Sequence, residues 1–301
     1  MQDVRSKKHP TKLESVSRLI TLFRTFNQAK GLSSVTIRWY DENLSHFAKE
    51  YGSSFTSESI LSFFAHLQNE HSCHAVTVNM YFRSLRAFFN FCVAQKLIKD
   101  NPLQGLRQLK VHKTIHQILS METLGKALTR LQGYKRTGAR DVAIFLLLLD
   151  CGFRPGEIIN ICLQDINWVE NRIMVDGKTG QRIVPFSPKT RRALQSYMKV
   201  CKREEGEDTL FLSETGQPLN RNALRLIFMR LKEKMKLPNR FYPYLLRHAS
   251  ATYHLINGSN LEAVRLMLGH TSYEMTRNYL SLASLDLARA HRRTSPVEKL
   301  G

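Results

Sequence analysis

The sequence predicts a mainly α-helical protein with a small antiparallel β-sheet, an α+β fold, divided into two domains. Apolar residues recur at helical spacing through most of the 301 residues, as they do on the buried face of an amphipathic helix. Short alternating runs, which are typical of strands, occur in one stretch that follows Gly152. A basic segment with few apolar residues interrupts the helical pattern after Pro102. A chain of this length suggests roughly two domains.

The region 13–102 is expected to form a compact bundle of four helices joined by short connections. Asp100-Asn101-Pro102 is predicted to stop the last of them, because proline disfavours helix at the residue before it. Residues 1–12 are basic and polar and are interpreted as a loose N-terminal arm. The predicted helices lie at 13–30, 33–48, 56–67 and 77–97.

Residues 103–119 are interpreted as an interdomain linker, and 120–301 as the second domain. This domain is expected to begin at Ser120, where Ser-Met-Glu-Thr is typical of a helix start. The predicted order is helices at 121–131 and 138–149, strands at 165–168, 172–175 and 182–185 with a turn at 176–180, then helices at 189–201 and 221–235.

The stretch from Tyr244 to Tyr279 is predicted to bring an arginine, a histidine and a tyrosine together. Arg247 lies on a helix with an apolar face, and Asn257-Gly258 ends that helix. Asn260 is expected to cap a second helix, which closes with a glycine just before His270. We expect the ring of His270 to face a cleft, and a third helix to carry Tyr279.

The charge of the chain indicates a polyanionic partner. The formal net charge is +20 and the pI is about 10.0, which favours nucleic acid over a merely basic, solvated surface. Five cysteines without a C-x-x-C pair indicate reduced thiols in a cytosolic protein. The polar start shows no signal peptide, and the run I-F-L-L-L-L is too short to span a membrane. A cytoplasmic, nucleoid-associated protein without membrane partners is therefore expected.

Two further motifs carry chemistry that suits a DNA phosphate. C-G-F-R-P-G-E contains Arg154, and the turn G-K-T-G contains Lys178. Arginine meets a phosphate with a planar, permanently charged fork. Tyrosine can act as a nucleophile, and lysine or histidine can move protons. Such residue types are the ones that cleavage of a phosphodiester requires when no metal or cofactor takes part.

The R-H-x-x-A-T run, the L-G-H step and the later tyrosine resemble the tyrosine recombinases of the phage integrase group. By this resemblance, Arg154 and Arg247 clamp the scissile phosphate, and Lys178 protonates the leaving 5′-oxygen. Tyr279 attacks to form a 3′-phosphotyrosine, and His270 assists the nucleophile or the phosphate. The partner strand's 5′-hydroxyl then reseals the joint through a Holliday junction.

One position departs from the family's H-x-x-R pattern, because Tyr244 stands where a histidine is usual. A phenol can donate a hydrogen bond to phosphate, but with a pKa of roughly 10 it is a poor base near neutral pH. We therefore expect altered proton handling rather than inactivity. His248, next to Arg247, is interpreted as structural.

The resemblance implies a compact, Xer-like site-specific DNA recombinase. Tyr244 and the ending A-H-R-R-T-S-P-V-E-K-L favour a recombinase of a mobile element. Its N-terminal helical domain would bind the core of a double-stranded DNA site. A C-terminal helix at 280–290 would dock on a neighbour in a homotetramer, or pack on its own domain in the free monomer. The alternatives are a non-catalytic DNA-binding relative and an enzyme similar to type IB topoisomerases. Candidate DNA contacts, which are equally well explained as solvated helix faces, are Arg38, Arg83, Arg86, Lys110 and Lys113.

Overall fold

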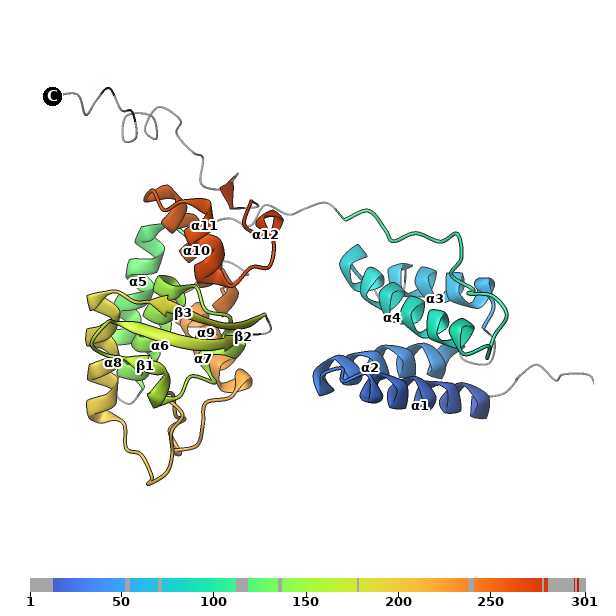
Figure 1. The fold of residues 1–301 in the computed structure, drawn as a ribbon, viewed down its shortest axis with the longest axis horizontal. Helices are drawn as coiled ribbons and strands as arrows, with labels where there is room; N and C mark the ends of the chain where they lie inside the picture. The colour runs from blue at the N-terminus through green and yellow to red at the C-terminus, as the bar shows by residue number, and fades with distance from the viewer. Residues whose placement is uncertain are drawn as a thin grey trace, which may run out of the picture. The chain divides into compact units, whose positions relative to one another are not determined.

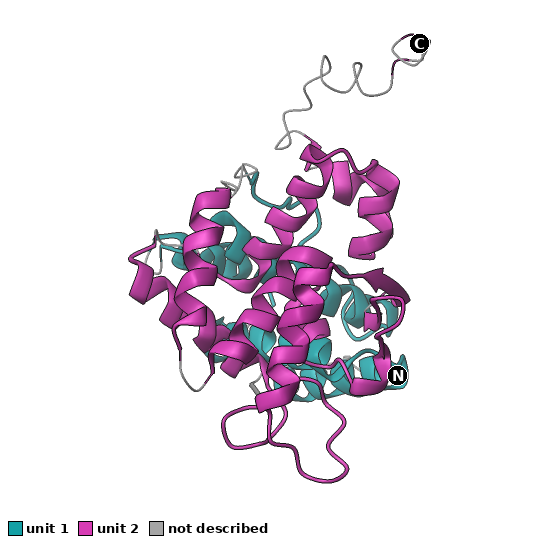
Figure 2. Cartoon of the chain, turned by 90° about the vertical axis from the view of Figure 1, so that its left-hand side faces the viewer, with its two compact units in different colours: residues 1–114 teal, residues 115–301 magenta. Residues whose placement is uncertain are grey.

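The protein forms two compact units, Met1–Thr114 and Ile115–Gly301 (Figure 2). A computed structural model describes residues 13–51, 55–69, 72–111, 119–134, 137–177, 179–237, 241–277, 279–280, 295 and 297. Figure 1 shows helices throughout and one small sheet in the second unit. The predicted fold class is therefore confirmed.

The first unit contains the four expected helices, built around an aromatic core. Ser33 starts α2 by accepting a hydrogen bond from the Thr36 amide, as a capping serine does. The helices are α1 (Leu13–Ala29), α2 (Ser34–Tyr51), α3 (Ser57–Asn69) and α4 (Ala75–Ala94). Four phenylalanines are almost completely buried between them, namely Phe47, Phe63, Phe88 and Phe89.

The fourth helix ends earlier than expected, and proline is not the reason. Lys96 adopts a left-handed conformation with φ of 56°. The amide of Lys96 donates to the Val93 carbonyl and that of Leu97 donates to the Cys92 carbonyl. This is the Schellman arrangement that terminates a helix. The expectation that Asp100-Asn101-Pro102 stops this helix is therefore wrong.

The segment after Pro102 packs back on the first unit. Leu103 is buried in its core. The Asn79 side chain donates to the Leu109 carbonyl and accepts from the Leu109 amide, both at 2.8 Å. Residues 112–118 lie outside the described residues, so the boundaries given for the arm, the helical domain, the linker and the catalytic domain stay predictions.

The second unit is built around α6 (Gly138–Cys151), against which α5 (Met121–Gln132), α8 (Pro188–Val200) and α10 (Pro243–Ile256) pack (Figure 1). Apolar residues cover most of α6, as expected of a helix enclosed by others. Ser120 caps α5 as predicted. The other helices are α7 (Pro155–Ile158), the 3-10 turn η1 (Leu163–Asp165), α9 (Arg221–Met235), α11 (Leu261–Leu268) and α12 (Tyr273–Arg277).

The sheet has the order β1-β2-β3 and is antiparallel. Its strands are β1 (Ile166–Asn167), β2 (Arg172–Gly177) and β3 (Gly180–Pro185). Gly177 pairs with Gly180, so the turn is tighter than the predicted 176–180. Gly180 has φ of +99°, a conformation that glycine adopts without strain. The short turn places Thr179 against the end of α11, where its hydroxyl donates to the Gly269 carbonyl.

The C-terminal helices follow the prediction with one difference. Asn260 caps α11 by accepting from the Ala263 amide at 2.7 Å, and Gly269 closes it with φ of 63°. The third helix, α12, ends at Arg277, and Tyr279 lies in a turn after it, its amide donating to the Thr276 carbonyl. Tyr279 is thus not carried by the helix, contrary to expectation. Apart from Leu280, the predicted helix at 280–290 lies outside the described residues.

No described helix is long and apolar enough to cross a membrane. Within the described ranges, no cluster of histidine, cysteine and acidic side chains could hold a metal ion.

Candidate active site

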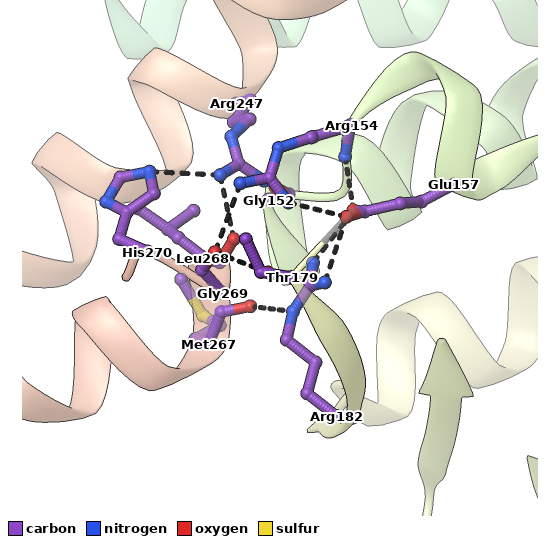
Figure 3. A network of polar contacts seen from close by, with 10 residues as sticks. All are labelled: Gly152, Arg154, Glu157, Thr179, Arg182, Arg247, Met267, Leu268, Gly269 and His270. Carbon is purple, nitrogen blue, oxygen red and sulfur yellow. Dashed lines mark hydrogen bonds and ion pairs between the residues drawn. The ribbon is translucent and has the colours of Figure 1, made fainter. Parts of the chain in front are cut away.

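Arg247 lies at the centre of the site, where the C-terminal ends of α6 and α11 meet its guanidinium. Nη1 donates to the Gly152 carbonyl at 2.6 Å, and Nη2 donates to the Leu268 carbonyl at 2.8 Å (Figure 3). Gly152 permits this closure, because a Cβ there would lie 2.6 Å from Leu268 Cδ2. Burial, and then the nearby Arg154, lower the pKa of Arg247 to about 10. The guanidinium is therefore charged at neutral pH, although only 3% of Arg247 is exposed.

The sequence led us to expect that the His270 ring faces a cleft. In the structure the ring is instead buried, and it is fixed in its neutral form. Nε2 lies 3.0 Å from Arg247 Nη2, and Nδ1 lies 2.8 Å from Thr276 Oγ1. Arginine can only donate, so Nε2 accepts and the proton is on Nδ1. Burial, followed by the charges of Arg247 and Arg154, lowers the pKa of His270 to about 4. At neutral pH the ring is thus a hydrogen-bond acceptor for Arg247.

The buried neutral histidine should make the fold sensitive to acid. In the unfolded chain His270 has a pKa of about 6.5, against about 4 in the fold. Between these values the unfolded state binds a proton that the folded state does not, so the free energy of unfolding decreases as pH falls. We expect His270 to account for a loss of roughly 2–3 kcal/mol between pH 7 and pH 4.5. Urea denaturation of the wild type and His270→Gln at both pH values measures it. Equal losses in the two proteins would contradict the assignment.

Arg154 is held by Glu157, three residues later. Its amide donates to Glu157 Oε2 and its Nη1 to Oε1, both at 2.7 Å. Its Nη2 reaches across to the Gly269 carbonyl at 3.1 Å. Burial favours a raised pKa for Glu157, but hydrogen bonds from Arg182 and Arg154 outweigh it and lower the pKa. The ionised carboxylate of Glu157 therefore orients Arg154.

Arg182, on β3, also binds Glu157. Its Nη1 and Nη2 donate to the two carboxylate oxygens at 2.9 and 2.8 Å, and its Nε donates to the Met267 carbonyl at 2.8 Å. Figure 3 shows the guanidinium between Glu157 and the end of α11. This residue belongs to the same polar network as Arg154 and Arg247.

Tyr279 contacts this network through two histidines. Its hydroxyl lies 2.9 Å from His248 Nδ1, and its ring stacks on His270 with centroids 6.2 Å apart. Only 7% of Tyr279 is exposed, and it packs with Leu255 and Leu268. Burial raises the pKa of its phenol, while Arg247 lowers it in part. His248, interpreted as structural from the sequence, is thus in hydrogen-bond contact with the phenol.

The predicted catalytic residues are only partly described. Arg154, Arg247 and His270 share a continuous network, and Tyr279 adjoins it. Tyr244 lies one turn before Arg247 on α10 with 46% of it exposed.

Lys178 lies outside the described residues. Its neighbours are described, and Thr179 contacts the site through the Gly269 carbonyl. Among the candidate DNA contacts, Arg38, Arg83, Arg86 and Lys110 are exposed on the first unit, and Lys113 lies outside the described residues.

Sequence reasoning missed Glu157, Arg182, His248 and Thr276 as members of the site. Glu157 could have been found, because a glutamate three residues after a non-helical residue is typical of a helix start. Arg182 and Thr276 give no comparable local signal. The partners of Arg182 are distant in the chain, and the contact of Thr276 depends on how the His270 ring is oriented.

Comparisons with known proteins give matches over both units of the chain. The family model described as "Phage integrase family" matches residues 118–285, and "Phage integrase, N-terminal SAM-like domain" matches residues 19–99. Tyrosine recombinase XerC of Bacillus subtilis is 31% identical over 210 residues, covering 67% of this chain and 69% of that protein. Tyrosine recombinase XerD of Halalkalibacterium halodurans is 27% identical over 282 residues, covering 89% and 94%.

Solved structures share the fold. The Tn1549 transposon integrase in complex with a circular intermediate DNA has a TM-score of 0.77 at 21% identity, covering 94% of this chain and 99% of that one. The XerH site-specific recombinase bound to its palindromic substrate has a TM-score of 0.71 at 18% identity, covering 95% and 85%. At these identities the likeness is one of fold.

Proposed function

The chain belongs to the phage integrase family and is a tyrosine recombinase, and we propose that the network around Arg247 is its DNA strand-cleavage site. The observation that carries this proposal is the convergence of Arg154, Arg247, His270 and Tyr279 from separate segments on one buried cluster. The reaction is site-specific recombination, by cleavage and rejoining of DNA strands.

In the proposed reaction, the Tyr279 oxygen attacks the scissile phosphorus and the bond to the 5′-oxygen breaks. Arg154 and Arg247 hold the non-bridging oxygens, whose negative charge grows in the transition state. Lys178 gives a proton to the departing 5′-oxygen. The resulting 3′-phosphotyrosine retains the bond energy, and the partner strand's 5′-hydroxyl attacks it, which releases Tyr279.

The phenolic proton needs an acceptor as the attack proceeds. Tyr244 is suited to donate a hydrogen bond to a phosphate oxygen but is a poor base. His248 Nδ1 is 2.9 Å from the Tyr279 hydroxyl, so we assign the acceptor role to His248. The pH dependence of cleavage by His248→Asn tests this role, because asparagine can accept a hydrogen bond but not a proton. Since the phenol is buried, it must also shift before it meets a phosphate.

The N-terminal unit is proposed to bind the core of the DNA site. In this scheme, 1–12 is an arm, 13–102 the DNA-binding domain, 103–119 a linker and 120–301 the catalytic domain. The match of an N-terminal SAM-like model to residues 19–99 supports it. So does the presence of DNA in the solved complexes of the Tn1549 integrase and XerH.

The exposed cations of this unit and the segment after it are proposed to contact phosphates. Each lost contact should reduce the salt dependence of DNA binding. The slope of the logarithm of the binding constant against the logarithm of the salt concentration should change by about 1. Binding titrations of single alanine variants over a range of salt concentrations measure it. The candidates are Arg38, Arg83, Arg86, Lys110 and Lys113.

We further propose a homotetramer on two DNA sites, held together through the segment 280–290. An enzyme that acts on genomic or plasmid DNA would work in the cytoplasm, at the nucleoid. The likeness to a transposon integrase favours a role in integration, excision or resolution of a mobile element. Native gels of the protein with and without a DNA site test the assembly.

A plasmid assay separates the recombinase from its alternatives. A binding site selected from random DNA is placed twice on a supercoiled plasmid, and a plasmid without the site serves as the control. Recombined products from the first plasmid alone are the expected result. Relaxation of both plasmids would indicate activity like that of a type IB topoisomerase. Binding of the site without cleavage would indicate a non-catalytic DNA-binding protein.

A further inference from the structure

We propose that Arg182 is a positioning residue for strand cleavage, holding Arg154, the β2–β3 hairpin and the His270 turn in one fixed arrangement. This role presupposes the cleavage site proposed above. Arg182 is a member of β3, and only 10% of its side chain is exposed. Its contacts reach Glu157, 25 residues away in the chain, and Met267, 85 residues away.

The first link runs from Arg182 to Arg154 through one carboxylate. Arg182 binds both oxygens of Glu157 in a bidentate pair, the geometry in which arginine fixes a carboxylate most strongly. The same two oxygens accept from the amide and Nη1 of Arg154. The plane that Arg182 imposes on Glu157 therefore sets where the Arg154 guanidinium can lie (Figure 3).

The second link runs from Arg182 to the turn that carries His270. Arg182 Nε donates to the Met267 carbonyl in the last turn of α11. Gly269, which closes α11, lies against the Arg182 side chain, since a Cβ on Gly269 would be 3.0–3.1 Å from three Arg182 atoms. A Cβ on Gly177 would likewise lie 2.7 Å from Glu157 Oε1 and 3.2 Å from Arg182 Nη1. The backbone of the hairpin at Gly177 and the backbone of the turn at Gly269 therefore both lie too close to Arg182 or Glu157 to leave ordinary room for a side chain.

The charges of this cluster suit a reacting phosphate. Arg154, Arg182 and Arg247 supply three positive charges and Glu157 one negative charge, which leaves an excess of two. A phosphodiester carries one negative charge, and a second develops as the nucleophile attacks. Fixed cations that match charge developing in the transition state stabilise it without reorganisation. Arg154 and Arg247 are the proposed phosphate ligands. Arg182 binds Glu157 and adds its positive charge to the electrostatic field at the phosphate.

A positioning role predicts a loss of cleavage with retained binding. We expect Arg182→Met to slow single-turnover cleavage of a nicked DNA site roughly 10- to 100-fold, because displacements of about 1 Å at a reacting centre have effects of this size. The dissociation constant for DNA should change less than threefold, since many phosphate contacts outside this cluster contribute to binding. Arg182→Lys should rescue little, because an ammonium cannot bind both carboxylate oxygens and the Met267 carbonyl as the fork does. Arg172→Met is the matched control, since Arg172 lies exposed on the adjacent strand and pairs with exposed Glu170.

A double-mutant cycle separates positioning from a general loss of structure. If Arg182 acts through Glu157, Arg182→Met combined with Glu157→Gln should cleave about as slowly as the slower single variant. Additive losses, cleavage by Arg182→Met within twofold of wild type, or full rescue by Arg182→Lys would each overturn the proposal. Where Arg182→Met does not fold, Arg182→Lys carries the same comparison. If the wild type forms no covalent adduct, the proposed function itself fails. If the wild type cleaves and Arg182→Met cleaves equally fast, the role of Arg182 is refuted and the proposed function stands.

Discussion

Replacing Tyr279 with phenylalanine should abolish the covalent protein–DNA adduct while leaving DNA binding intact. The substitution removes one oxygen, the proposed nucleophile, and keeps the ring that stacks on His270. The lost hydrogen bond to His248 should cost about 1–3 kcal/mol of stability, too little to unfold a typical domain. A nicked DNA site that traps the intermediate, followed by a denaturing gel, measures the adduct.

Tyr273→Phe provides the control for this experiment. Tyr273 begins α12, close in the chain to the nucleophile, and half of it is exposed. Its variant should form the adduct at the wild-type rate. An adduct formed by Tyr279→Phe would show that another side chain attacks the phosphate. Loss of DNA binding in parallel with the adduct would indicate that Tyr279 supports the fold rather than the chemistry.

The helices were predictable because their signals are local. Ser120 and Asn260 cap helices through amides three residues ahead, a spacing that can be read directly from the sequence. The end of α4 was not predictable in this way, because Lys96 takes a left-handed conformation that the sequence marks with no glycine. Helix ends that depend on backbone hydrogen bonds alone leave little trace in residue types.

The motifs indicated which residues form the site, but not how they are held. The resemblance identified Arg154 and Arg247 from their neighbours in the chain. It could not show that His270 turns inward, since this depends on Arg247 and Thr276 both contacting the ring. Arg182 was missed for a related reason. An arginine on a short strand usually faces solvent, and only the folded chain brings it to Glu157 and Met267.

The second large effect is expected at Lys178. Lys178→Ala should slow strand cleavage about 10²- to 10⁴-fold, the usual contribution of a general acid, with little change in DNA binding. The reason lies in the leaving group, because an alkoxide is a poor leaving group unless a proton reaches it as the bond breaks. In the sequence Lys178 falls between Gly177, which pairs with Gly180 at the end of the hairpin, and Thr179, which contacts the site through the Gly269 carbonyl. Lys189→Ala, at an exposed lysine near the start of α8, is the matched control.

A change of leaving atom makes this prediction specific to proton transfer. If sulfur replaces the bridging 5′-oxygen, the leaving group is a thiolate, which is stable near neutral pH because thiols have a pKa of about 8.5. Such a substrate should restore cleavage by Lys178→Ala towards the wild-type rate and should not help Tyr279→Phe, which lacks the attacking atom. A Lys178→Ala enzyme that stays slow on the sulfur substrate would contradict the general-acid role. Equal losses of binding and cleavage would instead make Lys178 a structural residue of the hairpin, so the two measurements together decide between chemistry and architecture at this position.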